Sequence, residues 1–482
     1  MTQVPYDGGM RLGITATALS LAILAATGLF TATATASPQT TNQPTVAGPV
    51  TGGRVGIPFS SSPVPLGPAG YSEQEYFLSG TATGYQQAGT WGGDGRWSAA
   101  PAEQAPYETR ILVRRPSDPA RFNGTVVVEW LNVTTGADLD PDYLYDNAEL
   151  LREGYAWVGV SAQAVGVNAL RAIDPARYAG LSHPGDTFSY DIFSQAARSL
   201  LNPDGIQPLG GLRPKALIAD GESQSALRMT TYANAIQPID HLFNGFLIHS
   251  RSADAAPISQ APQVAQASPG VAEDRTDLGV PVLAVETETD LFTAPLFYQQ
   301  LSQPDSARFR LWELAGSSHV DANMIALGGV EVSPFVPVPP DSCALPANSD
   351  QENYLMDDAL AQLDRWVRVG VPAVSAPRIE VDGSTIVRDA DGNALGGMRS
   401  PIVQAPTASH SGTGNSGPSI ECQLSGTTTP FTPAQLSARY PTHAAYVAAV
   451  SVAALRDVAR GYLLPVDAAE AIKTAGSAPI PA

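Results

Sequence analysis

The stretch ALIADGESQS at residues 216–225 reads as a buried strand, a sharp turn and the start of a helix. A serine at such a turn is held out over the edge of a parallel sheet, where the next backbone N–H and the helix N-terminus face developing negative charge. Ser223 has this position between the small residues Gly221 and Ser225, although Ser225 stands where a glycine is usual. We therefore predict Ser223 as a nucleophile and the Gln224 N–H as an oxyanion donor; a plain helix N-cap serine is the alternative.

The rest of the chain surrounds this stretch with alternating strand and helix patterns. Runs of apolar and β-branched residues predict strands at residues 76–80, 110–114, 125–131, 155–161, 216–219, 246–249, 280–285 and 309–314. Helix-like stretches lie at residues 143–152, 190–201, 224–236 and 294–301. Strands without polar alternation, separated by helices, indicate a parallel sheet covered on both faces. The predicted fold is α/β, with a doubly wound, mostly parallel sheet.

The composition excludes several classes of function. The 482 residues carry a formal net charge of −19, with 27 basic residues and no basic run. Such a chain has nothing to neutralise a phosphate backbone, so nucleic acid is not an expected partner. The six histidines and two cysteines form no cluster at zinc-ligand spacing. We predict neither a metal site nor a cofactor.

The N-terminus has the features of a signal peptide. Arg11 precedes an uncharged stretch at residues 12–30, and small Ala and Thr residues follow it. We predict a signal peptide over residues 1–36, cleaved after Ala34 or Ala36, and a secreted or cell-envelope location. An uncleaved membrane anchor is the alternative, and only then would the chain contact a membrane.

The predicted organisation has a core with additions at both ends. Residues 37–70, rich in Thr, Pro, Gly and Ser, are expected to form a linker or surface strap before a core at residues 71–342. Insertions at residues 163–187 and 251–278 leave the carboxyl ends of strands, where ligands bind in open α/β sheets, so both are lid candidates. Residues 343–482 are predicted to be an elaboration packed on the core, with helices at 357–369, 444–461 and 466–473 and a β-like patch at 378–403.

Cys343 and Cys422 are the two cysteines of the chain. In an oxidising compartment an even pair is more often bridged than free, so we predict a disulfide between them. Two separately buried thiols are the alternative.

A serine nucleophile needs a base, and His319 is the predicted one. It ends the stretch LWELAGSSH at residues 311–319, which reads as an apolar strand, a glycine turn and a loop at the edge of the sheet. His249 also ends a strand and is the rival.

The base needs a carboxylate that holds its tautomer. Residues 286–290, with the sequence ETETD, end the strand before His319 and place an acid between serine and histidine in chain order. We predict Asp290, with Glu288 as the alternative acid.

Three stretches together resemble serine hydrolases of the α/β-hydrolase superfamily, in a bacterial exported branch: GESQS at residues 221–225, ETETDLF at 286–292 and AGSSH at 315–319. Residues 183–186 (HPGD), 189–195 (SYDIFSQ) and 440–447 (YPTHAAYV) resemble that branch in particular. The resemblance spans about residues 70 to 475 and implies an ester hydrolase with a Ser-acid-His triad.

The second oxyanion donor is expected in the loop after the third strand, at residues 129–133. This loop lacks an HGGG-type run, and we predict the backbone N–H of Leu131 or Asn132. In the alternative interpretation, Trp130 and Asn132 only pack and cap the turn.

The sequence thus predicts hydrolysis of a small-molecule or polymer ester through Ser223, Asp290 and His319. Two alternatives remain open: a catalytically silent scaffold that binds a ligand or partner, and the same chemistry on amide, peptide or thioester bonds.

Overall fold

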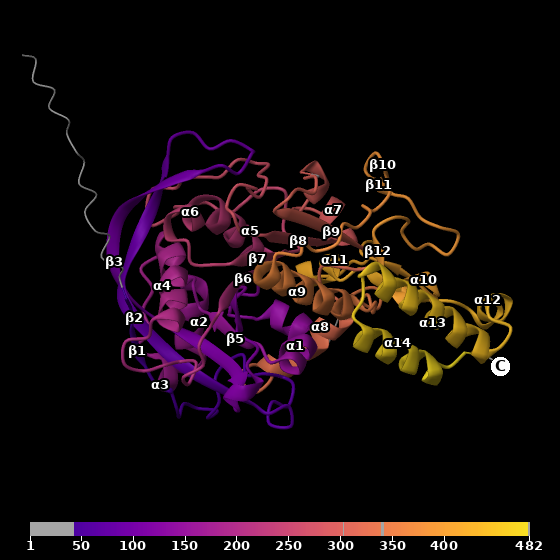
Figure 1. The fold of residues 1–482 in the computed structure, drawn as a ribbon, viewed down its shortest axis with the longest axis horizontal. Helices are drawn as coiled ribbons and strands as arrows, with labels where there is room; N and C mark the ends of the chain where they lie inside the picture. The colour runs from indigo at the N-terminus through magenta and orange to yellow at the C-terminus, as the bar shows by residue number, and fades with distance from the viewer. Residues whose placement is uncertain (1–42, 302, 339–341, 481–482) are drawn as a thin grey trace, which may run out of the picture. The chain divides into compact units, whose positions relative to one another are not determined.

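A mixed ten-stranded sheet forms the centre of the part of the chain described by the computed structural model, residues 43–480 without 302 and 339–341 (Figure 1). Its strands, in spatial order, are β1 (Thr45–Ala47), β2 (Tyr71–Ala88), β3 (Ser98–Pro116), β5 (Ala156–Val160), β4 (Thr125–Trp130), β6 (Ala216–Glu222), β7 (Gly245–His249), β8 (Val282–Thr287), β9 (Phe309–Ala315) and β12 (Met398–Arg399).

In this spatial order, the seven strands from β5 through β12 run parallel to one another. The pairs β1–β2, β2–β3 and β3–β5 are antiparallel. Every residue of β4, β5, β6, β7 and β8 is buried. Strands covered on both faces need apolar residues on both, which explains their continuous Val, Ile, Leu and Ala runs. The predicted α/β fold with a mostly parallel sheet is confirmed.

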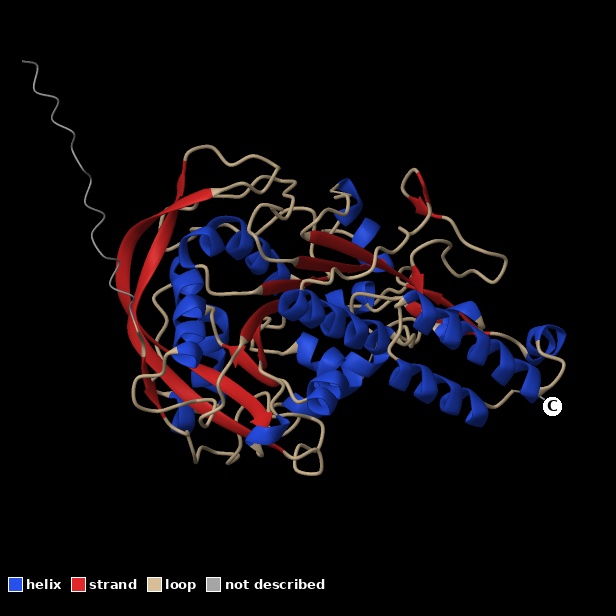
Figure 2. Cartoon of the chain, in the orientation of Figure 1, coloured by secondary structure: helices blue, strands red, loops and turns tan. Residues whose placement is uncertain are grey.

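Helices pack on both faces of this sheet (Figure 2). Alternate residues of β4 point to opposite faces: Val126 and Val128 join the core under α4 (Ser189–Leu201) and α5 (Gln224–Thr231). Val127 instead joins the core under α1 (Pro141–Glu153) and α9 (Glu352–Val369). Shorter helices are α2 (Ala164–Ile173), α3 (Pro175–Tyr178), α6 (Gln237–Asp240) and α7 (Glu288–Phe292).

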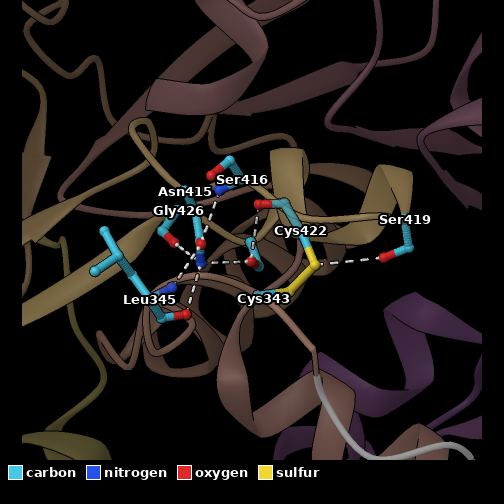
Figure 3. Close-up of a disulfide and its surroundings, with 8 residues drawn as sticks. Cys343, Leu345, Asn415, Ser416, Ser419, Cys422 and Gly426 are labelled. Carbon is cyan, nitrogen blue, oxygen red and sulfur yellow. Dashed lines mark hydrogen bonds between the residues drawn. A yellow bond between two sulfur atoms is a disulfide. The ribbon is translucent and has the colours of Figure 1, made fainter.

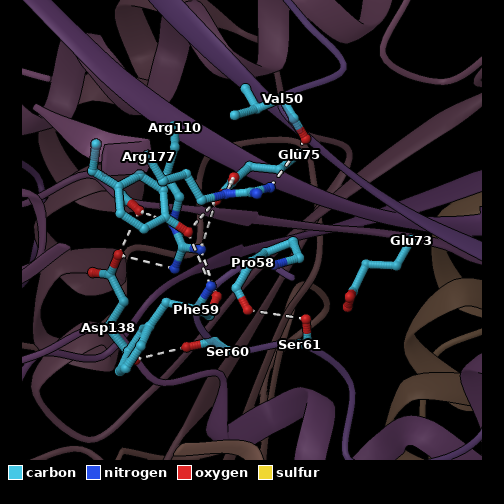
Figure 4. Close-up of polar contacts among 12 residues, drawn as sticks. Val50, Pro58, Phe59, Ser60, Ser61, Glu73, Glu75, Arg110, Asp138 and Arg177 are labelled. Carbon is cyan, nitrogen blue, oxygen red and sulfur yellow. Dashed lines mark hydrogen bonds and ion pairs between the residues drawn. The ribbon is translucent and has the colours of Figure 1, made fainter. Parts of the chain in front are cut away.

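The segment at residues 43–70 differs from a simple surface strap. Phe59 and Ser60 are buried, and their carbonyl oxygens accept hydrogen bonds from the guanidinium groups of Arg110 and Arg114. Both arginines are fully buried in β3, and Arg110 also pairs with Glu75 at 3.1 Å (Figure 4). A buried guanidinium needs an acceptor for each of its donors, and the backbone carbonyls of residues 43–70 supply some of these acceptors.

The helix predicted at residues 294–301 is wrong. The helix in this region is α7, six residues earlier, and only a 3-10 turn at Tyr298–Gln300 lies in the predicted range. Thr287 and Asp290 form a capping box that starts α7, and Pro295 carries no N–H to continue a helix.

The C-terminal part contributes to the core as well as packing on it. β12 extends the main sheet beside β9, and α9 covers one face of the sheet. The remaining elements are α8 (Ala322–Val332), β10 (Val381–Asp382), β11 (Thr385–Ile386), α10 (Pro401–Gln404), β13 (Ala408–Ser411), α11 (Ile420–Leu424), β14 (Thr427–Pro430), α12 (Pro433–Arg439), α13 (His443–Arg460) and α14 (Pro465–Ser477).

The predicted signal peptide, residues 1–36, lies outside the described residues. Within residues 43–480, no helix is both long and apolar enough to cross a membrane.

Candidate active site

Ser223 lies at the sharp turn between β6 and α5. Its backbone has φ 57° and ψ −118°, a region that residues with a side chain rarely adopt. The turn is tight, because a Cβ on Gly221 would lie 3.1 Å from the backbone carbon of Ser225. The Ser223 N–H donates to the His249 carbonyl at 2.8 Å, which ties the turn to the neighbouring strand β7. The strained turn leaves Ser223 partly exposed at the carboxyl edge of the sheet.

His319 and Asp290 form a chain of hydrogen bonds with this serine. Ser223 Oγ lies 2.8 Å from His319 Nε2, and His319 Nδ1 lies 2.6 Å from Asp290 Oδ1. Asp290 Oδ2 accepts from the backbone and hydroxyl of Thr287, at 2.6 and 2.8 Å, and from Ser250 Oγ at 2.9 Å. The structure thus brings together the three residues selected from the sequence, which lie 67 and 29 positions apart in the chain.

Charge and burial shift the pKa values of this pair in opposite directions. Burial alone would lower the pKa of His319, but the carboxylates of Asp290 and Glu222 raise it above its usual value. Burial alone would raise the pKa of Asp290, but His319 and the Thr287 hydrogen bonds hold it below its usual value. Asp290 is therefore ionised and holds the proton of the imidazole on Nδ1.

Glu288, the alternative acid, points away from His319. Its Oε1 accepts from the Gly316 N–H at 2.7 Å, and its Oε2 pairs with Arg388 at 2.7 Å and accepts from the Gly412 N–H at 3.1 Å. Glu288 therefore joins the turn before His319 to the C-terminal part of the chain.

His249, the alternative base, has no hydroxyl partner among the residues that the structure describes. Its ring lies between Asp142, 2.8 Å from Nδ1, and Glu352, 3.2 Å from Nε2, and it is fully buried. Although burial would lower its pKa, the two carboxylates raise the pKa of His249 well above its usual value.

The structure corrects the two predictions for the second oxyanion donor. The Leu131 N–H donates to the Val160 carbonyl at 3.2 Å, and the Asn132 N–H donates to the Leu139 carbonyl at 2.9 Å. Neither N–H is free: Leu131 continues the pairing of β4 with β5, and Asn132 forms an isolated antiparallel bridge with Leu139 within the loop. Gln224, by contrast, is the first residue of α5, where backbone N–H groups have no partner within the helix.

Asn132 has a different role, since its side chain bridges to the turn. Its Nδ2 donates to the Glu222 carbonyl at 3.1 Å and to Glu222 Oε2 at 3.0 Å, while its Oδ1 accepts from the Thr134 N–H at 2.8 Å. Glu222 is a neighbour of the site that sequence reasoning missed: its Oε1 lies 3.2 Å from His319 Nε2. Glu222 occupies the variable position between Gly221 and Ser223 of the motif, so the sequence pattern did not indicate a role for it.

The two insertions contact each other and α5. The insertion at residues 163–187 contains α2, α3 and a 3-10 turn at Asp186–Phe188, so it is not a loop. Thr187 Oγ1 lies 3.0 Å from Ser259 Oγ of the second insertion. Arg228 of α5 donates to Asp186 and to Gln260, both at 3.2 Å, and so binds one residue of each insertion.

A disulfide joins Cys343 to Cys422 (Figure 3). Residues near both cysteines contact the loop that carries His319. The Val320 N–H donates to the Leu424 carbonyl at 3.2 Å, two residues from Cys422. Asn348 Nδ2 donates to the Gly316 carbonyl at 2.6 Å, so segments near both cysteines support this loop.

A family described as "Alpha/beta hydrolase domain" matches residues 46–473, which is most of the sequence and includes every residue of this site. The chain belongs to this family. The family makes it a hydrolase. Separately, the described residues contain no group of three or more His, Cys, Asp or Glu side chains that could hold a metal ion.

Three solved structures that resemble this chain have low sequence identity to it. An α/β serine hydrolase from Xanthomonas campestris is 15% identical, covering 48% of this chain and 92% of its own, with a TM-score of 0.29. A serine hydrolase homologue from Coxiella burnetii is 14% identical, covering 48% of this chain and 93% of its own, with a TM-score of 0.28. An esterase domain from Rhodothermus marinus is 12% identical, covering 48% and 90%, with a TM-score of 0.26. No protein with a curated description matches the chain.

Proposed function

We propose that this α/β-hydrolase cleaves carboxylic esters with Ser223 as nucleophile, His319 as base and Asp290 as the residue that orients the base. The observation that carries the proposal is the chain of hydrogen bonds from Ser223 Oγ through His319 to Asp290, with Ser223 held on a strained turn. A nucleophile, a base and an orienting acid in this order are the parts that acyl transfer to serine requires.

The proposed reaction has two steps. Ser223 Oγ attacks the ester carbonyl carbon while its proton moves to His319 Nε2, and the resulting tetrahedral oxyanion collapses as His319 gives that proton to the departing alkoxide. A water molecule then attacks the acyl-serine, again giving a proton to Nε2. The acid product leaves, and Oγ recovers the proton. Asp290 remains ionised throughout and stabilises the imidazolium.

The oxyanion needs two donors, and we propose the N–H groups of Gln224 and Val133. Gln224 follows the nucleophile and opens α5. Val133 follows the two loop residues whose N–H groups are occupied, and its own N–H has no acceptor among the described residues although Val133 is buried. An N–H without a protein acceptor is available to donate to a substrate oxygen.

Export also remains a proposal. It is supported by the signal-peptide pattern at residues 1–36 and by a cysteine pair joined in a disulfide, which persists in oxidising compartments. Sequencing the N-terminus of protein collected from the culture medium tests it: cleavage after Ala34 or Ala36 is expected, and retention of residues 1–36 in the cytoplasmic fraction would contradict it.

A fluorophosphonate probe, which phosphonylates activated serines, tests the nucleophile. We expect one adduct on Ser223 and loss of both labelling and ester hydrolysis in Ser223→Ala. Ser225→Ala is the matched control, because Ser225 lies in the same turn and its hydroxyl has no partner among the described residues. Labelling that survives in Ser223→Ala, or is lost in Ser225→Ala, would contradict the proposal. Matched ester, thioester and amide substrates then test the bond type, with the ester expected to react fastest.

A further inference from the structure

A buried carboxylate that this mechanism does not use lies beside the base. Glu222 Oε1 is 3.2 Å from His319 Nε2, the nitrogen that also lies 2.8 Å from Ser223 Oγ. Glu222 and His319 are each 2% exposed, so water does not screen the contact. The imidazole therefore has an acid on each side: Asp290 at Nδ1 and Glu222 at Nε2.

The Glu222 side chain is held in this place by Asn132. The Asn132 amide donates to both the carbonyl and the Oε2 of Glu222, and the rest of Asn132 is occupied by the Thr134 N–H and by Leu139. With Oε2 held by a fixed donor, Oε1 is left to face the imidazole. Asn132 therefore holds both the backbone and the carboxylate of Glu222.

We propose that Glu222 is a positioning residue that stabilises the His319 imidazolium from its Nε2 side, while Asp290 stabilises it from its Nδ1 side. The inference rests on the proposed function, in which Nε2 receives the proton of Ser223. The new N–H on Nε2 then lies between the reacting oxygen and the Glu222 carboxylate. An opposite charge within about 4 Å favours the protonated imidazole, so Glu222 lowers the energy of the charged intermediate.

The charges around the pair set the pH range of the effect. Burial raises the pKa of Glu222 to about 8, although His319 and His249 oppose the shift. Glu222 is therefore mostly uncharged below about pH 8 and carries its charge above it. The titratable groups that face this pair are Asp290, Asp142, His249, Glu352 and Tyr145. Because the charge stabilises the imidazolium, kcat/KM should rise through a step near pH 8, as Glu222 ionises in the free enzyme, and an enzyme without this carboxylate should lack that step.

The test is the pH profile of kcat/KM for ester hydrolysis in wild type and in Glu222→Gln. The amide keeps the shape of the side chain and an acceptor for Asn132 but removes the charge. We expect the step near pH 8 to disappear and kcat above pH 8 to fall about tenfold. Asp220→Asn is the matched control: Asp220 is also fully buried, two residues earlier on the same strand, but its charged neighbours are Asp142, Glu129 and Asp146 rather than His319.

A merely structural Glu222 would lower the melting temperature in Glu222→Gln without removing the step near pH 8, and that result overturns the inference. So does loss of the same step in Asp220→Asn. If Glu222→Gln does not fold, Asn132→Ala decides: loss of its hydrogen bond disfavours the Glu222 carboxylate, so the step should move to higher pH, and an unmoved step refutes the role. Ser223→Ala separates the two proposals, because activity that survives there contradicts the mechanism itself, whatever Glu222 does.

Discussion

Two buried histidines in this protein each lie between two carboxylates, but only one of them contacts a hydroxyl. His319 lies between Asp290 and Glu222 and contacts Ser223 Oγ. His249 lies between Asp142 and Glu352, with the ring of Tyr145 packed against it at 5.4 Å between centroids. The two sites are adjacent, because Glu222 is the register partner of His249 in the sheet.

The difference shows that a histidine paired with carboxylates is not by itself a candidate base. His249 sits at the end of a central strand, where its ring is closed in under α1 and α9 and its carbonyl holds the Ser223 N–H. His319 sits in a loop after a glycine turn, so its ring can reach a partly exposed serine. The loop position supplies access to a nucleophile, and the strand position supplies support for the turn.

The largest expected effect compares the two histidines directly. His319→Ala should lower kcat by about 10⁶-fold while the protein remains folded, because the proposed base is lost. His249→Ala should instead keep kcat per folded molecule within about tenfold but destabilise the protein by about 3–5 kcal/mol, since two buried carboxylates lose their partner. Active-site titration with chemical denaturation measures both. The reverse assignment of effects would make His249 the base.

The acids give the next comparison. Asp290→Asn should reduce kcat by about 10⁴-fold, because the amide favours the wrong imidazole tautomer. Glu288→Gln should cost less than about tenfold in kcat and show its effect as a lower melting temperature, because Glu288 pairs with Arg388 rather than His319. Steady-state kinetics beside thermal melts of both variants check this. Glu288 would be the acid if Glu288→Gln lost more activity than Asp290→Asn.

The disulfide should affect stability more than activity. It closes a loop with a sequence separation of 79, for which chain entropy gives a stabilisation of about 4 kcal/mol before strain. Cys343→Ser with Cys422→Ser should lower the melting temperature and make activity fall at a lower temperature, because the bridge supports the His319 loop. Activity at 10 °C should change little. Heat inactivation at the wild-type rate would show that the bridge does not support the site.

The smallest expected effect is the pH dependence of stability from His249. Its pKa is raised in the folded protein, so its contribution is fully present below about pH 6.5, the usual value for histidine, and is lost as pH rises through the folded pKa. One proton changes the free energy of unfolding by at most about 1.4 kcal/mol per pH unit. Urea denaturation between pH 6 and pH 9 should show stability falling with pH in wild type and a shallower slope in His249→Gln. Equal slopes would refute a charged His249.

Local pattern was enough to predict the fold class, because buried parallel strands need apolar runs without polar alternation, such as those at residues 126–128, 155–160 and 216–219. It also indicated Ser223, Asp290 and His319, since each follows the end of a strand, and parallel strands end at one edge of a sheet. The helix predicted at residues 294–301 failed because the capping box of Thr287 starts the helix earlier.

Tertiary structure decided what depends on contacts between segments distant in sequence. Asp290 contacts His319 and Glu288 contacts Arg388, although both lie in one short helix, because different sides of α7 face these two residues. The occupied N–H groups of Leu131 and Asn132 depend on Val160 and Leu139, and the position of Glu222 depends on Asn132 across the sheet edge. Sequence determines which chemical groups each strand end carries, whereas the packing of strands, helices and loops determines which of those groups meet and which are already occupied.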